Sequence, residues 1–394
     1  MTNKPVCVIS TVGQSVFLNA AEPLRKDFNE FRRRSDVELK PILEKEAFDG
    51  HDLYENMLAY LRALRAPNLR GASAELNSLD RILEGRTLTR ADQLHFLASD
   101  TPDGVLAARV IADFCREHFG LKEREQVTLH HITGLQVSDG TRFRREGLRS
   151  LIDCLYKILK KAPAGTYTRI LNPTGGFKGV VPYLTVVGML ENVQVSYIYE
   201  QSSALLTLAG LPVTLDYERL RPAYKALDEC SRRNLLSADE LKDLLGLAEG
   251  QAVGEHPAWP LFERVDIDGQ PTYALNGLGQ IVYQHLKDYQ RPKVYLSRQA
   301  DERYSKLDKT EQERFAAHFE ALRDPTRRKG KRHGKKGEAI IYKPGNVAER
   351  LFYFELEDGD VLVAELASHA DRSYEEMPDL KRRDYAPHRR WEGE

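Results

Sequence analysis

The chain has 394 residues, of which 41% are hydrophobic and 30% are charged. This balance is typical of folded globular proteins and excludes a disordered chain, and the length favours two or three domains. The 58 Lys and Arg residues nearly cancel the 59 Asp and Glu residues, giving a net charge of −1. The chain as a whole is therefore not a basic nucleic-acid-binding protein.

The sequence predicts neither a membrane span nor a metal site. The longest apolar run, residues 180–190, is interrupted by Pro182 and Gly188 and is too short to cross a bilayer. The N-terminus has no basic stretch followed by an apolar segment, so we expect a cytoplasmic protein with no membrane partner. The four cysteines lie far apart without a C-x-x-C pair, which argues against a disulfide framework and against a zinc site.

The first 215 residues alternate apolar runs with helical patterns. The runs are short and lack clean alternation, which is typical of buried parallel strands; they lie at residues 6–10, 93–99, 126–132, 167–171 and 193–199. Helical patterns occupy residues 103–118 and 141–160, and residues 20–34 and 53–64 predict helices in an insertion after the first strand. This order predicts a doubly wound α/β domain over residues 1–215.

Two turns that follow predicted strands suit an anionic ligand. The first is Ser-Thr-Val-Gly-Gln-Ser at residues 10–15, and the second is Asn-Pro-Thr-Gly-Gly-Phe-Lys-Gly at residues 172–179. Glycine lets backbone N–H groups approach a phosphate, and Lys178 adds a positive charge. Because such sheets bind ligands at the carboxyl ends of their strands, we expect both loops at one edge. Their spacing matches neither the P-loop nor the dinucleotide motif, which argues against ATP hydrolysis and nicotinamide chemistry.

These two loops resemble those of the CRISPR-associated Rossmann-fold (CARF) sensor domain. The resemblance implies a homodimer that binds a cyclic oligoadenylate across its two-fold axis, and cyclic tetra-adenylate matches that symmetry best. Some members of the family also cleave this messenger slowly, and that activity is a second hypothesis for this chain. The ligand contacts that the resemblance implies are Thr11, Gly13, Gln14 and Ser15 in the first loop and Asn172, Thr174, Gly175, Gly176, Phe177 and Lys178 in the second.

Residues 216–290 form a segment of different character. A helix is predicted over residues 217–232, and Ser237-Ala-Asp-Glu240 is a capping box that opens a helix over residues 241–245. Two short strands within residues 261–275 and a helix over residues 278–285 follow. Helices beside a β-hairpin resemble a winged-helix-like connector. Because no helix here is strongly basic, we expect dimerisation or signal relay and no DNA partner.

The last segment, residues 291–394, predicts a small α+β domain. A strand at residues 294–296 and helices over residues 301–322 precede strands at 338–343, 350–356 and 361–366, for which we expect an antiparallel sheet. Between them, residues 321–336 contain eight basic residues and one acid. We expect a loop there that contacts RNA phosphates, an ordinary solvated loop being the alternative. Its candidate contacts are Arg327, Arg328, Lys329, Lys331, Arg332, Lys335 and Lys336.

A hairpin turn at Asp358-Gly359 fixes an expected register for the last two strands. Paired residue numbers then sum to 717, so Arg350 lies opposite Ala367, and His369 points to the same face. Lys343, across the preceding turn, reaches the same end. This set suits metal-free RNA cleavage, in which a 2′-hydroxyl attacks the next phosphate, because the reaction needs proton transfer and cations that stabilise negative charge.

Residues 293–385 resemble the RelE family of toxin ribonucleases. The matching segments are Val294-Tyr-Leu-Ser, Glu349-Arg-Leu-Phe-Tyr353 and Ser368-His-Ala-Asp-Arg-Ser-Tyr374. The family cleaves messenger RNA in the ribosomal decoding site, and the match implies that activity here. The catalytic residues it implies are Lys343, Arg350, His369, Arg372 and Tyr374, with the general base being His369 or a lysine of residues 329–336.

The whole chain therefore resembles the CARF–RelE messenger-RNA interferases of type III CRISPR defence. The expected fold is multidomain α/β: a Rossmann-like sensor at residues 1–215, a winged-helix-like connector at 216–290 and an α+β RelE-like domain at 291–394. The expected activity is ribosome-dependent endoribonuclease switched on by cyclic oligoadenylate, without a cofactor. A CARF-regulated transcription regulator and a ribosome-independent ribonuclease remain the alternatives. The latter's family carries Arg-x4-6-His, and the chain's nearest match, Arg314 to His318, has three intervening residues.

Overall fold

The computed structural model describes residues 4–391 except 66–67, 123, 137–138, 200–203, 212, 249, 268, 346, 358 and 369–376. The chain divides into two compact units, residues 1–286 and 287–394. Each unit contains its own sheets and hydrophobic cores, so the expectation of a multidomain α/β fold is confirmed.

The first unit is built on a six-stranded sheet of order β3-β2-β1-β4-β5-β6. Five strands are parallel, as predicted, and β6 is an antiparallel edge strand that the sequence did not reveal. The strands are β1 (Val6–Thr11), β2 (Gln93–Ala98), β3 (Val127–His131), β4 (Thr168–Asn172), β5 (Gln194–Ile198) and β6 (Leu205–Leu208). This order, with the chain crossing between neighbouring parallel strands, is doubly wound.

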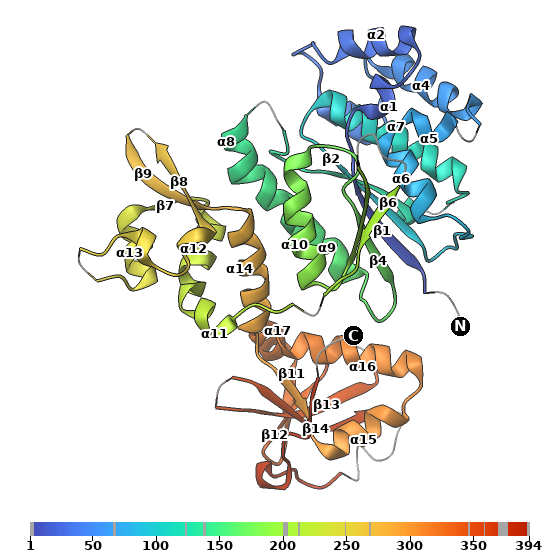
Figure 1. The fold of residues 1–394 in the computed structure, drawn as a ribbon. Coiled ribbons are helices and arrows are strands. Elements are labelled where there is room, and N and C mark those ends of the chain that lie inside the picture. Colours follow the sequence, from blue (N-terminus) through green and yellow to red (C-terminus); the bar gives the residue numbers. More distant parts are fainter. Residues whose placement is uncertain are drawn as a thin grey trace. The chain divides into compact units, whose positions relative to one another are not determined.

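Helices cover both faces of this sheet (Figure 1). Alternate residues of β1 divide between two cores: Val6 and Val8 belong to one, and Cys7 and Ile9 to the other. One face carries α1 (Ser15–Leu18), α2 (Glu22–Phe31), α3 (Leu39–Glu44), α4 (His51–Ala63), α5 (Asn68–Ala72), α6 (Ala74–Ile82) and α7 (Pro102–His118). The other face carries α8 (Gly140–Arg142), a π-helical turn (Phe143–Gly147), α9 (Leu148–Lys161) and α10 (Val181–Leu190).

The rest of the first unit is a helical segment with a small sheet of order β7-β9-β8 and a hydrophobic core of its own. It contains α11 (Tyr217–Leu220), α12 (Tyr224–Arg233), β7 (Leu236–Ser237), α13 (Ala238–Leu245), β8 (Phe262–Ile267), β9 (Gln270–Leu275) and α14 (Gly277–Tyr289). The predicted capping box is present, and Gly246 ends α13 in the left-handed conformation. The segment packs on α9, where the Asp153 carboxylate accepts hydrogen bonds from Gln280 and Gln284, both at 2.6 Å.

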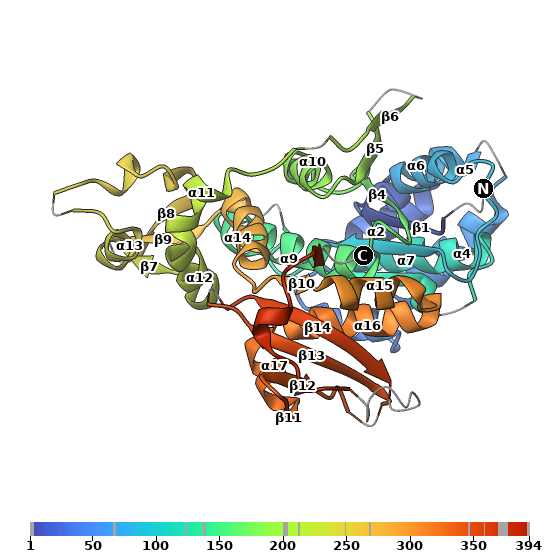
Figure 2. The ribbon, with the colours of Figure 1, turned by 90° about the horizontal axis from the view of Figure 1, so that it is seen from below.

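The second unit holds a six-stranded sheet of order β11-β12-β13-β14-β10-β15. Its elements are β10 (Val294–Leu296), α15 (Arg298–Lys306), α16 (Lys309–Leu322), α17 (Pro325–Gly330), β11 (Arg332–Lys336), β12 (Ala339–Tyr342), β13 (Glu349–Glu355), β14 (Val361–Ser368) and β15 (Arg389–Trp391). Helices α15 and α16 lie along one face, as Figure 2 shows. The opposite face carries a second small core that includes Phe352, Phe354 and Leu380.

Two expectations for this unit are corrected. The sheet is mixed rather than antiparallel, because β10 pairs in parallel with β14. The basic run is not a loop: Asp324 caps α17, and β11 then pairs along β12 as the edge strand of the sheet. Pairing with β12 satisfies backbone groups that a loop would leave to water.

Candidate functional site

The two glycine loops meet at the carboxyl edge of the first sheet. Strands β1 and β4 are neighbours, and the Thr11 hydroxyl donates a hydrogen bond to the Gly175 carbonyl at 2.6 Å. A Cβ atom on Gly13 would lie 2.7 Å from the Gly176 nitrogen. Glycine is therefore required at residue 13 for the loops to pack together, and the structure brings both predicted loops to one place.

Several of the predicted ligand residues are buried beneath this edge. Thr11, Asn172 and Thr174 are each at most 3% exposed. The Asn172 amide donates to Ser10 at 3.0 Å and to Ser78 at 2.9 Å, and the Thr174 hydroxyl donates to the Asn172 side-chain oxygen at 2.6 Å. These side chains are therefore buried supports of the loop and are not accessible to a ligand in this structure.

The accessible groups belong mainly to the second loop. Phe177 and Lys178 are exposed, and the Lys178 ammonium bonds the Thr174 carbonyl at 2.5 Å. Among the described residues, none accepts a hydrogen bond from the N–H groups of Gly175, Gly176 or Phe177. Gly176 adopts a positive φ of 79°. Successive free N–H groups around a left-handed glycine form a concave anion site, and a nearby ammonium strengthens it.

A buried carboxylate that the sequence analysis missed lies against both loops. Glu75, in the first turn of α6, is 0% exposed. Its carboxylate accepts hydrogen bonds from Gly13 N–H at 2.6 Å and from the hydroxyls of Ser15 and Ser73, both at 2.8 Å. The only local signal is a serine N-cap before α6, which predicts a helix start but not the contact with a loop 60 residues earlier.

A second missed cluster lies at the ends of β2 and β3. The Asp100 carboxylate bonds the His131 ring nitrogen at 2.9 Å, the Gly134 N–H at 2.9 Å and the Arg142 guanidinium at 2.8 Å. Gln14, predicted to contact the ligand, donates instead to Asp103 at the start of α7. The carboxyl edge of the sheet is thus a continuous polar rim in which most side chains already have partners.

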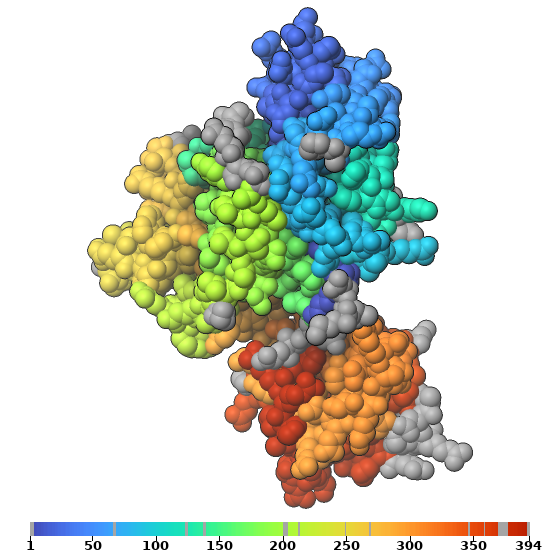
Figure 3. Space-filling view, turned by 45° about the vertical axis from the view of Figure 1, so that its right-hand side comes forward, coloured from blue at the N-terminus to red at the C-terminus, as the bar shows by residue number. Residues whose placement is uncertain are grey.

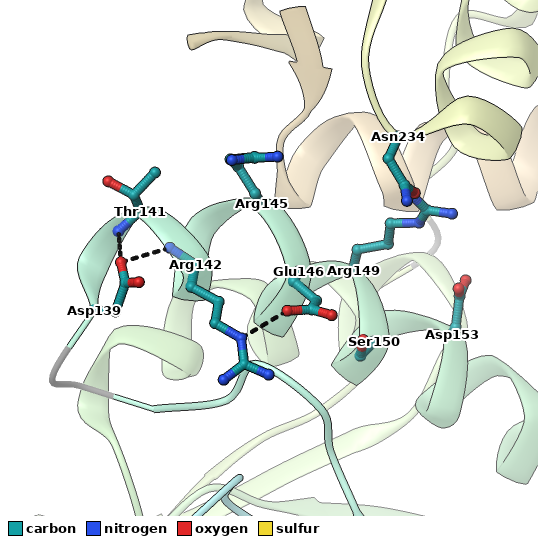
Figure 4. A pocket seen from close by; sticks show the side chains of 9 residues that line it. All are labelled: Asp139, Thr141, Arg142, Arg145, Glu146, Arg149, Ser150, Asp153 and Asn234. Carbon is teal, nitrogen blue, oxygen red and sulfur yellow. Dashed lines mark hydrogen bonds and ion pairs between the residues drawn. The ribbon is translucent and has the colours of Figure 1, made fainter. Parts of the chain in front are cut away.

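The helices behind this rim enclose a polar cavity of about 560 Å³. Figure 4 shows Arg142 on α8, Arg145 on the π-helical turn and Arg149 on α9, with Arg149 reaching Asn234. Arg142 pairs with Glu146 at 2.8 Å. Because carboxylates line the cavity as closely as the arginines do, it does not favour an anion.

In the second unit, the predicted pairing of Arg350 with Ala367 is confirmed. The pairs of β12 with β13 end at Tyr342 opposite Leu351, so Lys343 directly follows β12 at the end of the sheet where Arg350 lies. The other predicted catalytic residues, His369, Arg372 and Tyr374, lie outside the described residues. The structure therefore brings two of the five candidates to one end of the sheet, and His369 follows the end of β14.

Arg350 is held in an unusual environment for a cation. It is 3% exposed, and its Nη1 donates to the carbonyls of Val347 and Glu349 at 2.5 and 2.7 Å. Within the described part of the chain, its Nε atom is buried without a hydrogen-bond partner. A buried unsatisfied donor is costly and is often found at functional sites. A phosphate oxygen that reached this Nε–H would satisfy it.

Glu365 lies on the same face and was also missed by the sequence analysis. It pairs with Phe352 across the sheet, diagonal to Arg350, and accepts a hydrogen bond from the Tyr385 hydroxyl at 3.2 Å. Burial raises the pKa of this carboxyl, which brings it closer to the range useful for proton transfer at neutral pH.

The basic run divides into buried and exposed members. Arg328 is 5% exposed and pairs with Glu355 at 3.4 Å, which argues against its predicted contact with RNA. Arg332 bonds the same carboxylate at 2.8 Å. The exposed members are Arg327, Lys329, Lys331, Arg332 and Lys335, while Lys336 is half-buried. The available phosphate-binding groups are therefore mainly the lysines along α17 and the edge strand β11.

Among the described residues, no group of three or more His, Cys, Asp or Glu side chains could hold a metal ion. Within the same part of the chain, every helix is too short or too polar to span a bilayer.

Residues 70–211, less than half of the chain, match the family model described as CRISPR-associated protein (Cas_APE2256). The matched range runs from α5 to just beyond β6 and includes Glu75 and the second glycine loop. No curated protein matches the chain. The match supports a CRISPR-associated protein.

Proposed function

We propose that this chain is a ribonuclease that cleaves ribosome-bound messenger RNA when its first unit binds a cyclic oligoadenylate. The observation that carries the sensing half is the set of N–H groups at Gly175, Gly176 and Phe177, for which the described residues supply no acceptor, beside Lys178 and inside the matched range. A cyclic oligoadenylate is a ring of phosphodiesters, and this loop offers each phosphate backbone donors and a cation.

A homodimer follows from the same proposal, because a two-fold arrangement gives the ring two equivalent loops. The edge strand β6 supports it. Leu206 and Leu208 on that strand are 45% and 43% exposed, and β6 belongs to the part of the chain that is coloured yellow-green in Figure 3. An unpaired apolar edge strand is a surface that a second copy could cover.

The nuclease half rests on Arg350 and the residues that share its end of the sheet. A 2′-hydroxyl that attacks the adjacent phosphate builds negative charge on the phosphoryl oxygens, and a fixed guanidinium stabilises that charge. Lys343 would add a second cation, and His369, as the resemblance implies, would transfer the proton. No cofactor enters this scheme.

The test is cleavage of a translated messenger RNA, with and without ribosomes, in the presence of cyclic tri-, tetra- or hexa-adenylate. We expect cleavage only with ribosomes and only with the matching messenger, cyclic tetra-adenylate. Arg350→Ala and His369→Ala should abolish cleavage while messenger binding persists. Cleavage of free RNA would favour the ribosome-independent ribonuclease, and absence of cleavage together with messenger-dependent DNA binding would favour a transcription regulator.

A further inference from the structure

Glu75 occupies an unusual position for a carboxylate. It is 0% exposed, yet it lies between the first glycine loop, the start of α6 and Gly175 of the second loop. Burying an isolated carboxylate is strongly unfavourable unless donors compensate it. Here, one backbone N–H and two hydroxyls do so at 2.6 to 2.8 Å, the short distances of charge-assisted hydrogen bonds.

These contacts use two donors of the first loop, the Gly13 N–H and the Ser15 hydroxyl. The Gly13 N–H points to Glu75 Oε1, and the Ser15 hydroxyl donates to Oε2 while accepting the Ala74 N–H at 3.0 Å. A phosphate placed on these two donors would have to displace a buried carboxylate of the same charge. The Gly13 N–H and the Ser15 hydroxyl therefore contribute to the shape of the site rather than hydrogen bonds to a ligand.

We infer that Glu75 is a positioning residue for the messenger site: its carboxylate fixes the first glycine loop against the second, so that the free N–H groups of the second loop face the ligand. This inference rests on the proposed sensing function and adds a residue to it. The close packing supports it, because a Cβ at Gly175 would lie 1.8 Å from Glu75 Oε1. The opposite role, a plug that the messenger must expel, predicts the opposite effect of removing the charge.

The decisive variant is Glu75→Gln, which keeps the side-chain size and replaces one carboxylate oxygen by a donor. Asp92→Asn is the matched control. Asp92 is 4% exposed and accepts hydrogen bonds from Val6 N–H at 2.6 Å and the Thr89 hydroxyl at 2.7 Å, at the opposite end of β1. Both variants lose a buried, fully bonded carboxylate, but only one of them touches the loops.

Binding of cyclic tetra-adenylate is measured by calorimetry on the full chain, with thermal unfolding alongside. We expect Glu75→Gln to weaken binding by about tenfold or more and Asp92→Asn to change it by less than about twofold, even where both lower Tm. The messenger concentration that half-activates RNA cleavage should rise in Glu75→Gln, with the maximal rate unchanged. Unchanged or tighter binding in Glu75→Gln would overturn the inference, and tighter binding would establish the plug.

Should Glu75→Gln fail to fold, Ser15→Ala tests the same contact, since it removes one donor to the carboxylate. It should also weaken binding, and unchanged affinity would contradict the positioning role. Where both single variants and the double variant fold, the losses of binding free energy from Ser15→Ala and Glu75→Gln should be less than additive in the double variant. A wild-type chain that binds no cyclic oligoadenylate would overturn the proposed function and this inference together, whereas wild-type binding with an unaffected Glu75→Gln overturns the inference alone.

Discussion

Replacing Gly175 by alanine tests how tightly the two loops are built around Glu75. The added Cβ would lie 1.8 Å from Glu75 Oε1 and 2.3 Å from its Cδ. Since ordinary contacts between such atoms need about 3.5 Å, the carboxylate or the loop must shift by more than ~1 Å. That shift breaks hydrogen bonds from Gly13 and Ser15 to a charged group, each worth about 1.5–3 kcal/mol.

We therefore expect Gly175→Ala to lower the free energy of unfolding by about 3 kcal/mol, a fall in Tm of roughly 6–12 °C for a unit of this size. Gly165→Ala is the matched control, because nothing lies within 4 Å of its added Cβ; it should be neutral or stabilise by up to about 1 kcal/mol. The assays are thermal and urea unfolding of the full chain. If the two variants unfolded alike, Glu75 could not be packed beneath the loop.

A double variant separates the clash from other effects of the alanine. Glu75→Ala removes the atoms that the new Cβ would meet, so adding Gly175→Ala to it should cost much less than Gly175→Ala alone costs in the wild type. Such coupling between residues in contact is commonly about 0.5–3 kcal/mol. Additive losses in the double variant would show that the alanine acts through the backbone of the loop, and the steric argument would be wrong.

Three further outcomes follow from other parts of the structure. Arg350→Lys should lower messenger-RNA cleavage by about 10²-fold or more at saturating messenger, because lysine lacks the planar fork that reaches two carbonyls and a phosphate; near-wild-type cleavage in a single-turnover assay would exclude the role. Leu206→Glu with Leu208→Glu should yield a monomer in sedimentation velocity with reduced messenger affinity, and an unchanged dimer would exclude β6 as the interface. Burial lowers the pKa of His95 to about 3 and of His130 to about 4. The unfolded chain therefore takes up protons first as the pH falls below about 6.5, and each ring costs at most ~1.4 kcal/mol of stability per pH unit down to its folded pKa. Urea unfolding at pH 7.5 and pH 5 should show this loss, and His95→Gln should reduce it.

Most strands and helices of the chain were predictable because they depend on residues that are close together in the sequence. Apolar runs bounded by turns marked most strands of the two six-stranded sheets, although not β15, and the capping box at Ser237 and Glu240 marked the start of a helix that the structure contains. Edge strand β6 was missed, since its exposed residues do not alternate with buried ones. The basic run was misread as a loop because charge alone does not distinguish an edge strand from a turn.

The predicted register of the last hairpin is correct at Arg350, although the predicted two-residue turn does not by itself account for it. The Leu356 N–H bonds the Asp360 carbonyl, so three residues rather than two form the turn, and pairs near it sum to 716. An irregularity between Phe352 and Tyr353 shifts the register by one, which restores the predicted pairing of Arg350 with Ala367. Such a bulge depends on how the strands pack in the fold, so the residues of the turn do not predict it.

Glu75 shows which part of the candidate site lay beyond the sequence. Its partners Gly13 and Ser15 lie 62 and 60 residues away, and an insertion of several helices separates them. Only the wound topology, which returns α6 to the end of β1, makes them neighbours. The loops could be found from their glycines because phosphate chemistry leaves a local pattern, whereas the group that supports them is an ordinary glutamate on an amphipathic helix.

The charge distribution bears on how the nuclease would meet its substrate. The chain's net charge is −1, and two basic residues of residues 321–336, Arg328 and Arg332, are bound to Glu355. What remains exposed is Arg327 and Lys329 on α17, Lys331 after it and Lys335 on one edge strand. Affinity for free RNA scales with the number of phosphates neutralised, so a surface this small binds a free strand weakly. A ribosome that holds the messenger RNA in place removes the need for a large basic surface, because the ribosome then positions the RNA at the nuclease site.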